Sequence, residues 1–201
     1  MNKPIALIGA NGGMGLRYQA IMRYLEIPFS CFDVDDWKDA WILEGAFHSI
    51  LIATPTECHY ENIKYLSKLK IPILCEKPIT KDAEELLTIL ELDCEIKCVN
   101  QYKYLCDSQS TGDSYYNYFR TGRDGLAWDC ISIIALADKP PHLMNNSPKW
   151  SCMINGKELS SQDMDKAYVD MIREWYRKPE GDKNYIARAH DKVFGGFYVT
   201  D

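Results

Sequence analysis

Short apolar runs alternate with amphipathic segments along the first half of the chain. A continuous apolar run is typical of a strand buried on both faces of a parallel sheet, whereas apolar residues three and four apart are typical of a helix. The runs predict strands over residues 5–9, 29–34, 49–53, 71–75 and 96–99. The segments between them predict helices from Met14 to Leu25, over 60–69, and after Thr80, which suits a helix N-cap. This alternation predicts an α/β fold with a doubly wound parallel sheet.

A different pattern follows residue 105, where a polar stretch over residues 107–113 suits a linker. We therefore expect one domain over residues 1–105 and a small, reduced α+β domain over residues 106–201. The expected elements of the second domain are an apolar helix over 126–137, a proline-rich loop over 138–149, a hairpin turning at Asn155-Gly156, a helix starting at Ser160 or Ser161, and a short helix over 187–193. The tyrosine-rich stretch over 115–118 fits either a packed amphipathic strand or a substrate-binding surface.

Charge and composition narrow the classes of function. The net charge of −6 over 201 residues, with basic residues scattered among acids, repels phosphate backbones and argues against a nucleic-acid partner. No apolar stretch approaches the roughly 20 residues that cross a bilayer, and the chain starts without a leader pattern, so we expect no membrane association and a cytoplasmic location. The eight cysteines lack the spacing of zinc-binding or redox motifs, so we expect free thiols and no metal site.

A glycine-rich loop, Gly9-Ala10-Asn11-Gly12-Gly13-Met14-Gly15, directly follows the first predicted strand and opens a helix. Glycines permit a tight turn and a close backbone approach to a pyrophosphate, and the start of a helix offers unpaired N–H groups and partial positive charge. The loop therefore predicts a site for dinucleotide phosphates. The residues expected to contact the cofactor here are Gly9, Asn11, Gly12, Gly13, Met14 and Gly15.

An acidic residue stands at the end of the second predicted strand. Asp33 follows Gly15 by 18 positions, where a carboxylate can accept hydrogen bonds from the adenosine ribose hydroxyls. The same carboxylate would repel a 2′-phosphate, which favours NAD over NADP as the cofactor. Asp35 is the alternative contact, and a solvated acid at a strand end is the competing interpretation.

Two further segments point to a known family. Ala53-Thr54-Pro55 ends the third predicted strand with His59 four residues beyond the proline, and Glu76-Lys77-Pro78 ends the fourth. Together with the glycine loop, these segments resemble the glucose–fructose oxidoreductase and inositol dehydrogenase family over about residues 4–104. The resemblance implies a Rossmann-type NAD(P)-binding domain.

The resemblance also implies individual roles. Thr54 and Pro55 would line the nicotinamide side of the cofactor, and Glu76 would lie near the nicotinamide ribose. Lys77 would reach the substrate and assist proton transfer, because a partly desolvated lysine near a cofactor can have a lowered pKa that suits acid–base work. A surface lysine in a strand-end salt bridge is the competing interpretation. We interpret His59 as a structural residue at a helix start rather than as a catalyst.

The second half departs from the family pattern, which includes a large open-faced sheet and an Asp with a Gly two residues on and a His four residues on along a helix. Asp129 fits the acidic position, but Ile131 stands in place of the glycine and Ile133 in place of the histidine. An Asp and a His one helical turn apart would face the same pocket. A helix-start acid stabilised by the helix dipole is the competing interpretation of Asp129.

Three explanations of this departure stay open. Lys77 and Asp129 could suffice as catalytic groups, His142 could replace the missing histidine, or hydride chemistry has been lost. The leading prediction is an NAD(P)-dependent oxidoreductase that acts on a small sugar- or polyol-like carbinol or carbonyl. The alternatives are a non-catalytic dinucleotide-binding regulator or assembly module, and an NAD-assisted lyase or epimerase. The sequence leaves self-association of the chain open.

Overall fold

A computed structural model describes residues 3–33, 45–104, 115–121, 127–134, 142–144, 151–154 and 157–191. These residues form two compact units. The first unit joins the described residues up to Val99 with those from Arg173 onward, and the second comprises those from Asn100 to Ile172. The domain boundary expected at residues 105 and 106 stays a prediction.

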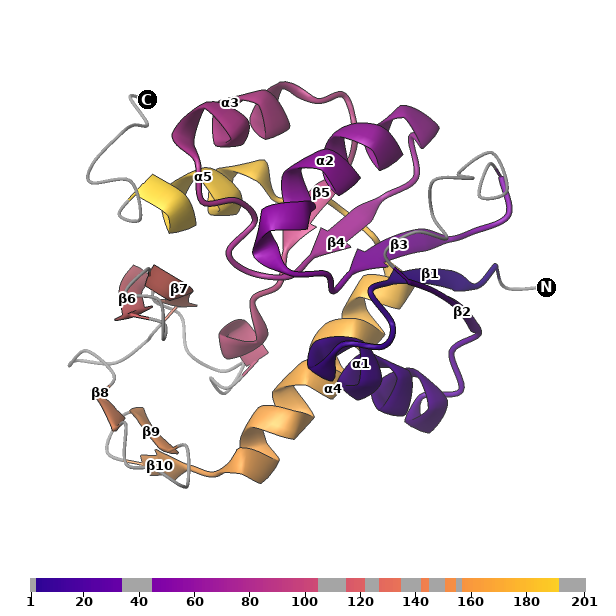
Figure 1. Cartoon of the computed structure of the whole chain (residues 1–201). Coiled ribbons are helices and arrows are strands. Elements are labelled where there is room, and N and C mark those ends of the chain that lie inside the picture. Colours follow the sequence, from indigo (N-terminus) through magenta and orange to yellow (C-terminus); the bar gives the residue numbers. More distant parts are fainter. Residues whose placement is uncertain are drawn as a thin grey trace. The chain divides into compact units, whose positions relative to one another are not determined.

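The first unit is built on a five-stranded parallel sheet with the strand order β2-β1-β3-β4-β5 (Figure 1). The strands are β1 (Ile5–Ile8), β2 (Phe29–Phe32), β3 (Ser49–Ile52), β4 (Ile73–Cys75) and β5 (Ile96–Cys98). The chain passes from β1 to β2 on one side and then returns to β3 on the other side of β1. The strand order therefore reverses between β1 and β3, where open α/β sheets bind their ligands.

Helices cover both faces of this sheet. They are α1 (Gly13–Tyr24), α2 (Thr56–Leu66) with the short 3-10 turn η2 (Ser67–Leu69), α3 (Ala83–Glu91) and α5 (Lys183–Asp191). Figure 1 shows α1 on one face, and α2, α3 and α5 on the other. Strands β1, β3 and β4 are fully buried, as their continuous apolar runs indicate. The predicted parallel sheet with helices is confirmed.

The start of α3 differs from the prediction by two residues. The N-cap is Asp82, whose Oδ1 accepts hydrogen bonds from the backbone N–H groups of Glu84 (2.8 Å) and Glu85 (3.0 Å). Thr80, the predicted cap, instead accepts the Asp82 N–H at 3.1 Å and donates its hydroxyl to the Glu85 carboxylate. Both residue types are good caps, and the aspartate stands directly before the first helical residue.

The second unit contains strands where part of the chain was expected to be helix or loop. Its strands are β6 (Tyr115–Thr121), antiparallel to β7 (Ala127–Ile134), and a three-stranded antiparallel sheet of β8 (His142–Met144), β9 (Ser151–Ile154) and β10 (Lys157–Leu159). The 3-10 turn η3 (Gln101–Tyr104) precedes them. The helix expected over 126–137 is therefore wrong at β7, and the loop expected over 138–149 is wrong at β8. The pairing of β9 with β10 confirms the hairpin strands, whereas the linker expected at 107–113 lies outside the described residues.

The apolar run at β7 illustrates an ambiguity of short apolar segments. Periodicity alone does not separate a buried strand from a buried helix in such a run. The β-branched Ile131, Ile133 and Ile134 favour the strand, and their partner strand β6 is rich in tyrosine and phenylalanine. A small reduced α+β domain in this half of the chain stays a prediction.

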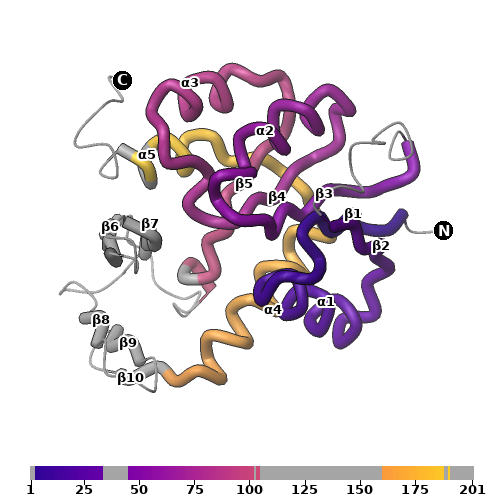
Figure 2. The backbone as a smooth tube through the Cα atoms, in the orientation of Figure 1, coloured from indigo at the N-terminus to yellow at the C-terminus, as the bar shows by residue number. Residues whose placement is uncertain are grey.

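One long helix, α4 (Ser161–Arg177), runs from the second unit into the first. A capping box starts it: Ser160 N donates to Asp163 Oδ2 at 2.7 Å, and Asp163 N donates to Ser160 Oγ at 3.3 Å. At its other end the fully buried Trp175 donates its Nε1–H to Ser49 Oγ of β3 at 3.1 Å. Figure 2 shows the chain then continuing to α5, beside β5. Among the described helices, none is long and apolar enough to cross a membrane.

Candidate functional site

The glycine loop packs directly against the end of β3. Gly9 follows β1 with φ +81°, a conformation that side chains other than glycine rarely adopt. A Cβ on Gly9 would lie 2.8 Å from the Thr54 backbone nitrogen and 2.9 Å from the Ala53 oxygen. The absence of a side chain therefore allows the backbone after β1 to touch the backbone after β3, at the point where the strand order reverses.

Helix α1 begins inside the same loop. A Cβ on Gly15 would lie 2.2 Å from the Gly9 oxygen, so this second glycine allows the helix to start directly above the turn. The N-cap residue Gly12 has no side chain to cap the helix, and the first turn of α1 contains no acidic residue. Gly13 is exposed, and a Cβ there would meet nothing within 4 Å. The start of α1 therefore has no capping side chain, and its positive dipole end suits the pyrophosphate of a dinucleotide.

The structure brings Asp33 to this loop. Asp33 follows β2, and its Oδ2 accepts a hydrogen bond from Nδ2 of the exposed Asn11. The two residues come from separate predicted segments and lie at the same edge of the sheet, because parallel strands end on one side. Met14 lies half-buried in the first turn of α1. Asp35 lies outside the described residues.

At the end of β3, the side chain of Thr54 is held by helix α2. Asn62 donates from Nδ2 to Thr54 Oγ1 at 3.0 Å, and both residues are buried. Pro55 is exposed and forms the N-cap of α2. Sequence reasoning missed Asn62, although a polar residue on the buried face of an amphipathic helix was a usable signal.

At the end of β4, both oxygens of the Glu76 carboxylate have donors. The buried Tyr18 of α1 donates its hydroxyl to Oε1, and the Lys77 backbone N–H donates to Oε2 at 3.1 Å. Glu76 is only 7% exposed, and Lys77 is half-buried. Tyr18 counted only as an apolar position in the sequence pattern of α1, so its polar role was missed.

Two buried histidines hold the segments that follow β3 and β4. The ring of His59 places Nε2 2.8 Å from the Thr54 oxygen and Nδ1 2.9 Å from the Pro78 oxygen. His190 of α5 accepts the Ile79 N–H on Nε2 at 2.9 Å. Burial lowers the pKa of His59, and burial lowers the pKa of His190 to about 4. No sequence pattern linked His190 to Ile79, because the two residues are 111 positions apart.

The remaining predicted site residues lie in the second unit. Asp129 lies in β7 opposite Arg120 of β6, so its expected place on a helix is wrong. Residues four apart rise by about 6 Å along a helix but by about 13 Å along a strand, so Asp129 and Ile133 do not have the expected one-turn spacing. His142 lies in β8. The proposed role of Asp129 therefore rests on the resemblance alone.

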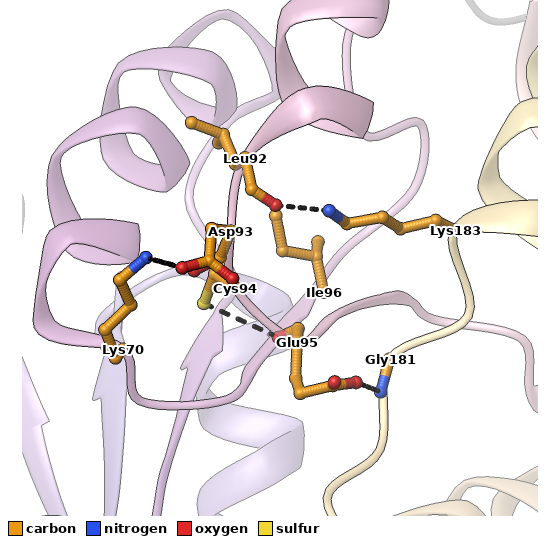
Figure 3. Close-up of a pocket in the computed structure, with 8 residues that line it drawn as sticks. All are labelled: Lys70, Leu92, Asp93, Cys94, Glu95, Ile96, Gly181 and Lys183. Carbon is orange, nitrogen blue, oxygen red and sulfur yellow. Dashed lines mark hydrogen bonds and ion pairs between the residues drawn. The ribbon is translucent and has the colours of Figure 1, made fainter.

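A separate hollow of about 510 Å³ lies at the opposite edge of the sheet, where β4 and β5 begin (Figure 3). The polar groups that line it form hydrogen bonds with one another. Lys70 Nζ donates to the backbone oxygen of Asp93 at 2.6 Å, and Gly181 N donates to Glu95 Oε2 at 2.6 Å. Burial raises the pKa of the Cys94 thiol in its lining to about 11, which disfavours the reactive thiolate. The glycine loop, the Thr54-Pro55 segment and the Glu76-Lys77 segment do not line this hollow. The described residues also hold no cluster of three metal-ligating side chains.

Comparison with known proteins finds similar sequences and a similar fold. The model of a family described as "Oxidoreductase family, NAD-binding Rossmann fold" (GFO/IDH/MocA) matches residues 16–104. An inositol 2-dehydrogenase of Pseudarthrobacter chlorophenolicus is 45% identical over 49 residues, which are 24% of this chain and 14% of the relative. An inositol 2-dehydrogenase of Leifsonia xyli is 40% identical over 60 residues, which are 30% of this chain and 16% of the relative. The chain thus spans only about a seventh of these relatives.

A solved structure has a similar fold over most of the chain. The WlbA dehydrogenase from Thermus thermophilus, in complex with NAD and UDP-GlcNAcA, has a TM-score of 0.61 at 15% identity and covers 95% of this chain and 93% of its own. The parallel sheet and the glycine loop have the arrangement of a Rossmann fold. Residues 16–104, a little under half of the chain, are similar to the GFO/IDH/MocA family of NAD-binding oxidoreductases.

Two glycines of the loop, Gly13 and Gly15, offer a matched test of this packing. We expect Gly15→Ala to lower the free energy of unfolding by about 1–3 kcal/mol, because its Cβ would overlap backbone atoms that have no room to move. Gly13→Ala places a methyl group in open space and should leave stability unchanged or slightly raised. Urea unfolding of both variants measures the difference. Equal destabilisation by the two substitutions would contradict the described packing.

The burial of His190 predicts a dependence of stability on pH. The pKa of His190 is about 4 in the folded chain, against an ordinary value of 6.5, so the unfolded chain binds more protons between these values. The free energy of unfolding should therefore fall as the pH drops from 7 to 4, by about 3 kcal/mol from this residue. His190→Gln does not titrate, so urea unfolding of this variant should show a shallower dependence. Identical pH profiles for the two proteins would contradict a buried neutral His190.

Proposed function

We propose that the chain binds NAD at the carboxyl edge of the sheet and transfers a hydride between nicotinamide and a sugar- or polyol-like carbinol or carbonyl. One observation carries the proposal: the glycine loop, the Thr54-Pro55 segment and the Glu76-Lys77 segment follow β1, β3 and β4 and meet at one edge. This edge includes the reversal of strand order, which is where α/β sheets bind nucleotides.

The loop and Asp33 serve the adenosine half of the cofactor. The backbone N–H groups of Gly13 and Met14, in the first turn of α1, bind the pyrophosphate, which the absence of a capping side chain supports. The Gly12 N–H donates to the Gly9 oxygen and shapes the turn. The Asp33 carboxylate accepts hydrogen bonds from the ribose hydroxyls, and its negative charge disfavours the 2′-phosphate of NADP. Its contact with Asn11 supports this role, because it keeps the carboxylate beside the loop.

The nicotinamide half lies toward β3 and β4. Thr54 and Pro55 line one side of the ring, and Glu76 binds the nicotinamide ribose. The bond from Tyr18 to Glu76 supports this role, since a carboxylate held by two donors is already oriented before the cofactor binds. When bound, nicotinamide supplies or accepts a hydride at its C4 atom.

Lys77 moves the proton. Its ammonium group donates a proton to the substrate oxygen in reduction, and the neutral amine accepts one in oxidation. The half-buried position of Lys77, directly after Glu76, supports this role. Asp129 is the proposed second acid–base group, on the strength of the sequence resemblance. The inositol 2-dehydrogenases and the WlbA dehydrogenase with UDP-GlcNAcA suggest inositols, sugars and nucleotide sugars as substrates to test.

A dinucleotide-binding regulator without turnover is the second candidate. The isoleucine at position 133 and the strand conformation of β7 favour it, since both depart from the family's helical Asp and His pair. Binding then depends on the first unit alone. Turnover with any substrate separates the two candidates.

Cofactor preference tests the role of Asp33. We expect the wild-type chain to bind NADH more tightly than NADPH, and Asp33→Asn to reduce this preference about tenfold, because the substitution removes the charge that repels the 2′-phosphate. Isothermal titration calorimetry with both cofactors measures the ratio. Asp82→Asn, at the cap of α3, is the control and should leave the ratio unchanged. A wild-type chain that prefers NADPH would overturn this assignment.

Turnover tests the role of Lys77. In assays of NADH absorbance with inositols, sugars and nucleotide sugars, we expect Lys77→Ala to lower kcat at least about 100-fold with little change in NADH affinity, because it removes the proton-transfer group. Lys81→Ala, an exposed lysine of the same connection, should leave kcat unchanged. NADH binding without turnover of any substrate would favour the dinucleotide-binding regulator. A chain that does not bind NADH would contradict both the oxidoreductase and the regulator.

A further inference from the structure

The segment that carries Lys77 is held from two helices. Residues 76–82 connect β4 to α3. On one side, the Pro78 oxygen lies 2.9 Å from Nδ1 of His59 in α2. On the other side, the Ile79 N–H donates to Nε2 of His190 in α5 at 2.9 Å. The two residues after Lys77 are therefore fixed by side chains that are remote in sequence.

The hydrogen bonds of His190 define a single state of its ring. Nε2 accepts the Ile79 N–H, so this atom carries no proton. The ring proton lies on Nδ1 and is donated to the Ile186 oxygen, one turn earlier in α5, at 2.8 Å. His190 is fully buried, and burial lowers its pKa and keeps the ring neutral. Its own helix thus orients the imidazole so that a lone pair points at the Lys77 segment.

The Ile79 N–H depends on this acceptor. Ile79 is fully buried and follows Pro78, which has no N–H of its own. Leaving a buried N–H without an acceptor costs about 1–3 kcal/mol, enough to shift the segment to another conformation. The ring of His59 lies between the Pro78 oxygen and the Thr54 oxygen, beside the ends of β3 and β4. A neutral imidazole has one N–H, so His59 donates to one of these two carbonyls at a time.

Helix α5 is a fixed support for His190. Its start is attached to the opposite edge of the sheet, where Asp182 N donates to the Ile96 backbone oxygen at 2.9 Å. Lys183 Nζ donates to the Leu92 backbone oxygen at the same edge (Figure 3). Ile186 packs in the hydrophobic core beneath the helix. The position of the imidazole is thereby determined by the sheet itself rather than by the segment it contacts.

We propose that His190 is a positioning residue: by accepting the Ile79 N–H, and together with His59, it sets the conformation of the segment that presents Lys77. The inference rests on the proposed function of Lys77 and adds to it a residue outside the family match, which ends at residue 104. His190 touches neither cofactor nor substrate in this proposal. It acts through the backbone of Ile79.

Three variants separate positioning from general stability. His190→Leu fills the space without an acceptor, and His190→Gln restores an acceptor oxygen. Ile186→Ala weakens the packing of the same helix but keeps His190, and it is the matched control. Amide hydrogen exchange of Ile79, measured by NMR against the amides of α1, should accelerate at least tenfold in His190→Leu only. His190→Gln should return the rate to near that of the wild type.

A second measurement addresses the segment that carries Glu76 and Lys77: the gain in affinity from nicotinamide reports on Glu76, and kcat reports on Lys77. The ratio of the affinities for NADH and for ADP-ribose, which lacks nicotinamide, should fall about tenfold in His190→Leu, together with kcat, and recover in His190→Gln. The Ile186→Ala variant should keep both values. In the wild type, imidazole ¹⁵N signals should show a protonated Nδ1 and an unprotonated Nε2 for His190 at neutral pH, a result that needs no variant.

The outcomes are distinct. The opposite His190 tautomer, unchanged Ile79 exchange in His190→Leu, the same effects from Ile186→Ala, or no recovery in His190→Gln would each overturn the positioning role. A wild-type chain that binds neither NADH nor ADP-ribose would overturn the proposed function. The exchange rates and the ¹⁵N signals would then still decide whether His190 holds the segment.

Discussion

The contact between the backbone after β1 and the backbone after β3 determines the rest of the site. Gly9 and Gly15 both lie where a Cβ would meet backbone atoms at less than 3 Å. With these two glycines, the turn lies flat against the end of β3 and α1 starts directly above it. The start of α1 therefore lies at the edge where the strand order reverses. Asp33 after β2 and Thr54 after β3 lie beside the loop, and Glu76 after β4 binds Tyr18 of α1.

A second set of contacts fixes the strand ends from the helices that cover the sheet. Tyr18 of α1 binds Glu76, Asn62 of α2 binds Thr54, and the two buried histidines bind the backbone after β3 and β4. Each contact pairs a buried polar group that would otherwise lose its hydrogen bond with water. The same hydrogen bonds that satisfy the buried groups also limit the conformations of the segments after β3 and β4. They therefore stabilise the fold and orient the candidate site residues at the same time.

What could be predicted from sequence was local. The strands, the glycine loop and the position of Asp33 follow from apolar runs, glycine spacing and the rule that parallel strands end on one side. The N-cap of α3 was misplaced because Thr80 and Asp82 both suit a cap, and β7 was misread because a short apolar run fits a strand or a helix. Tyr18 and His190 act through partners 58 and 111 positions away, and no local pattern encodes such pairs.

Dinucleotide binding and turnover place different demands on this chain. The loop, Asp33, Thr54 and Glu76 all belong to the first unit, so every residue proposed to bind the cofactor lies there. The family's helical Asp and His pair is replaced by a strand with isoleucine at position 133, which removes one source of proton transfer. Lys77, however, lies in the binding unit, on a segment fixed from α2 and α5. The residue proposed for proton transfer therefore lies in the same unit as the proposed cofactor site, whereas Asp129, the second proposed group, lies in the other unit.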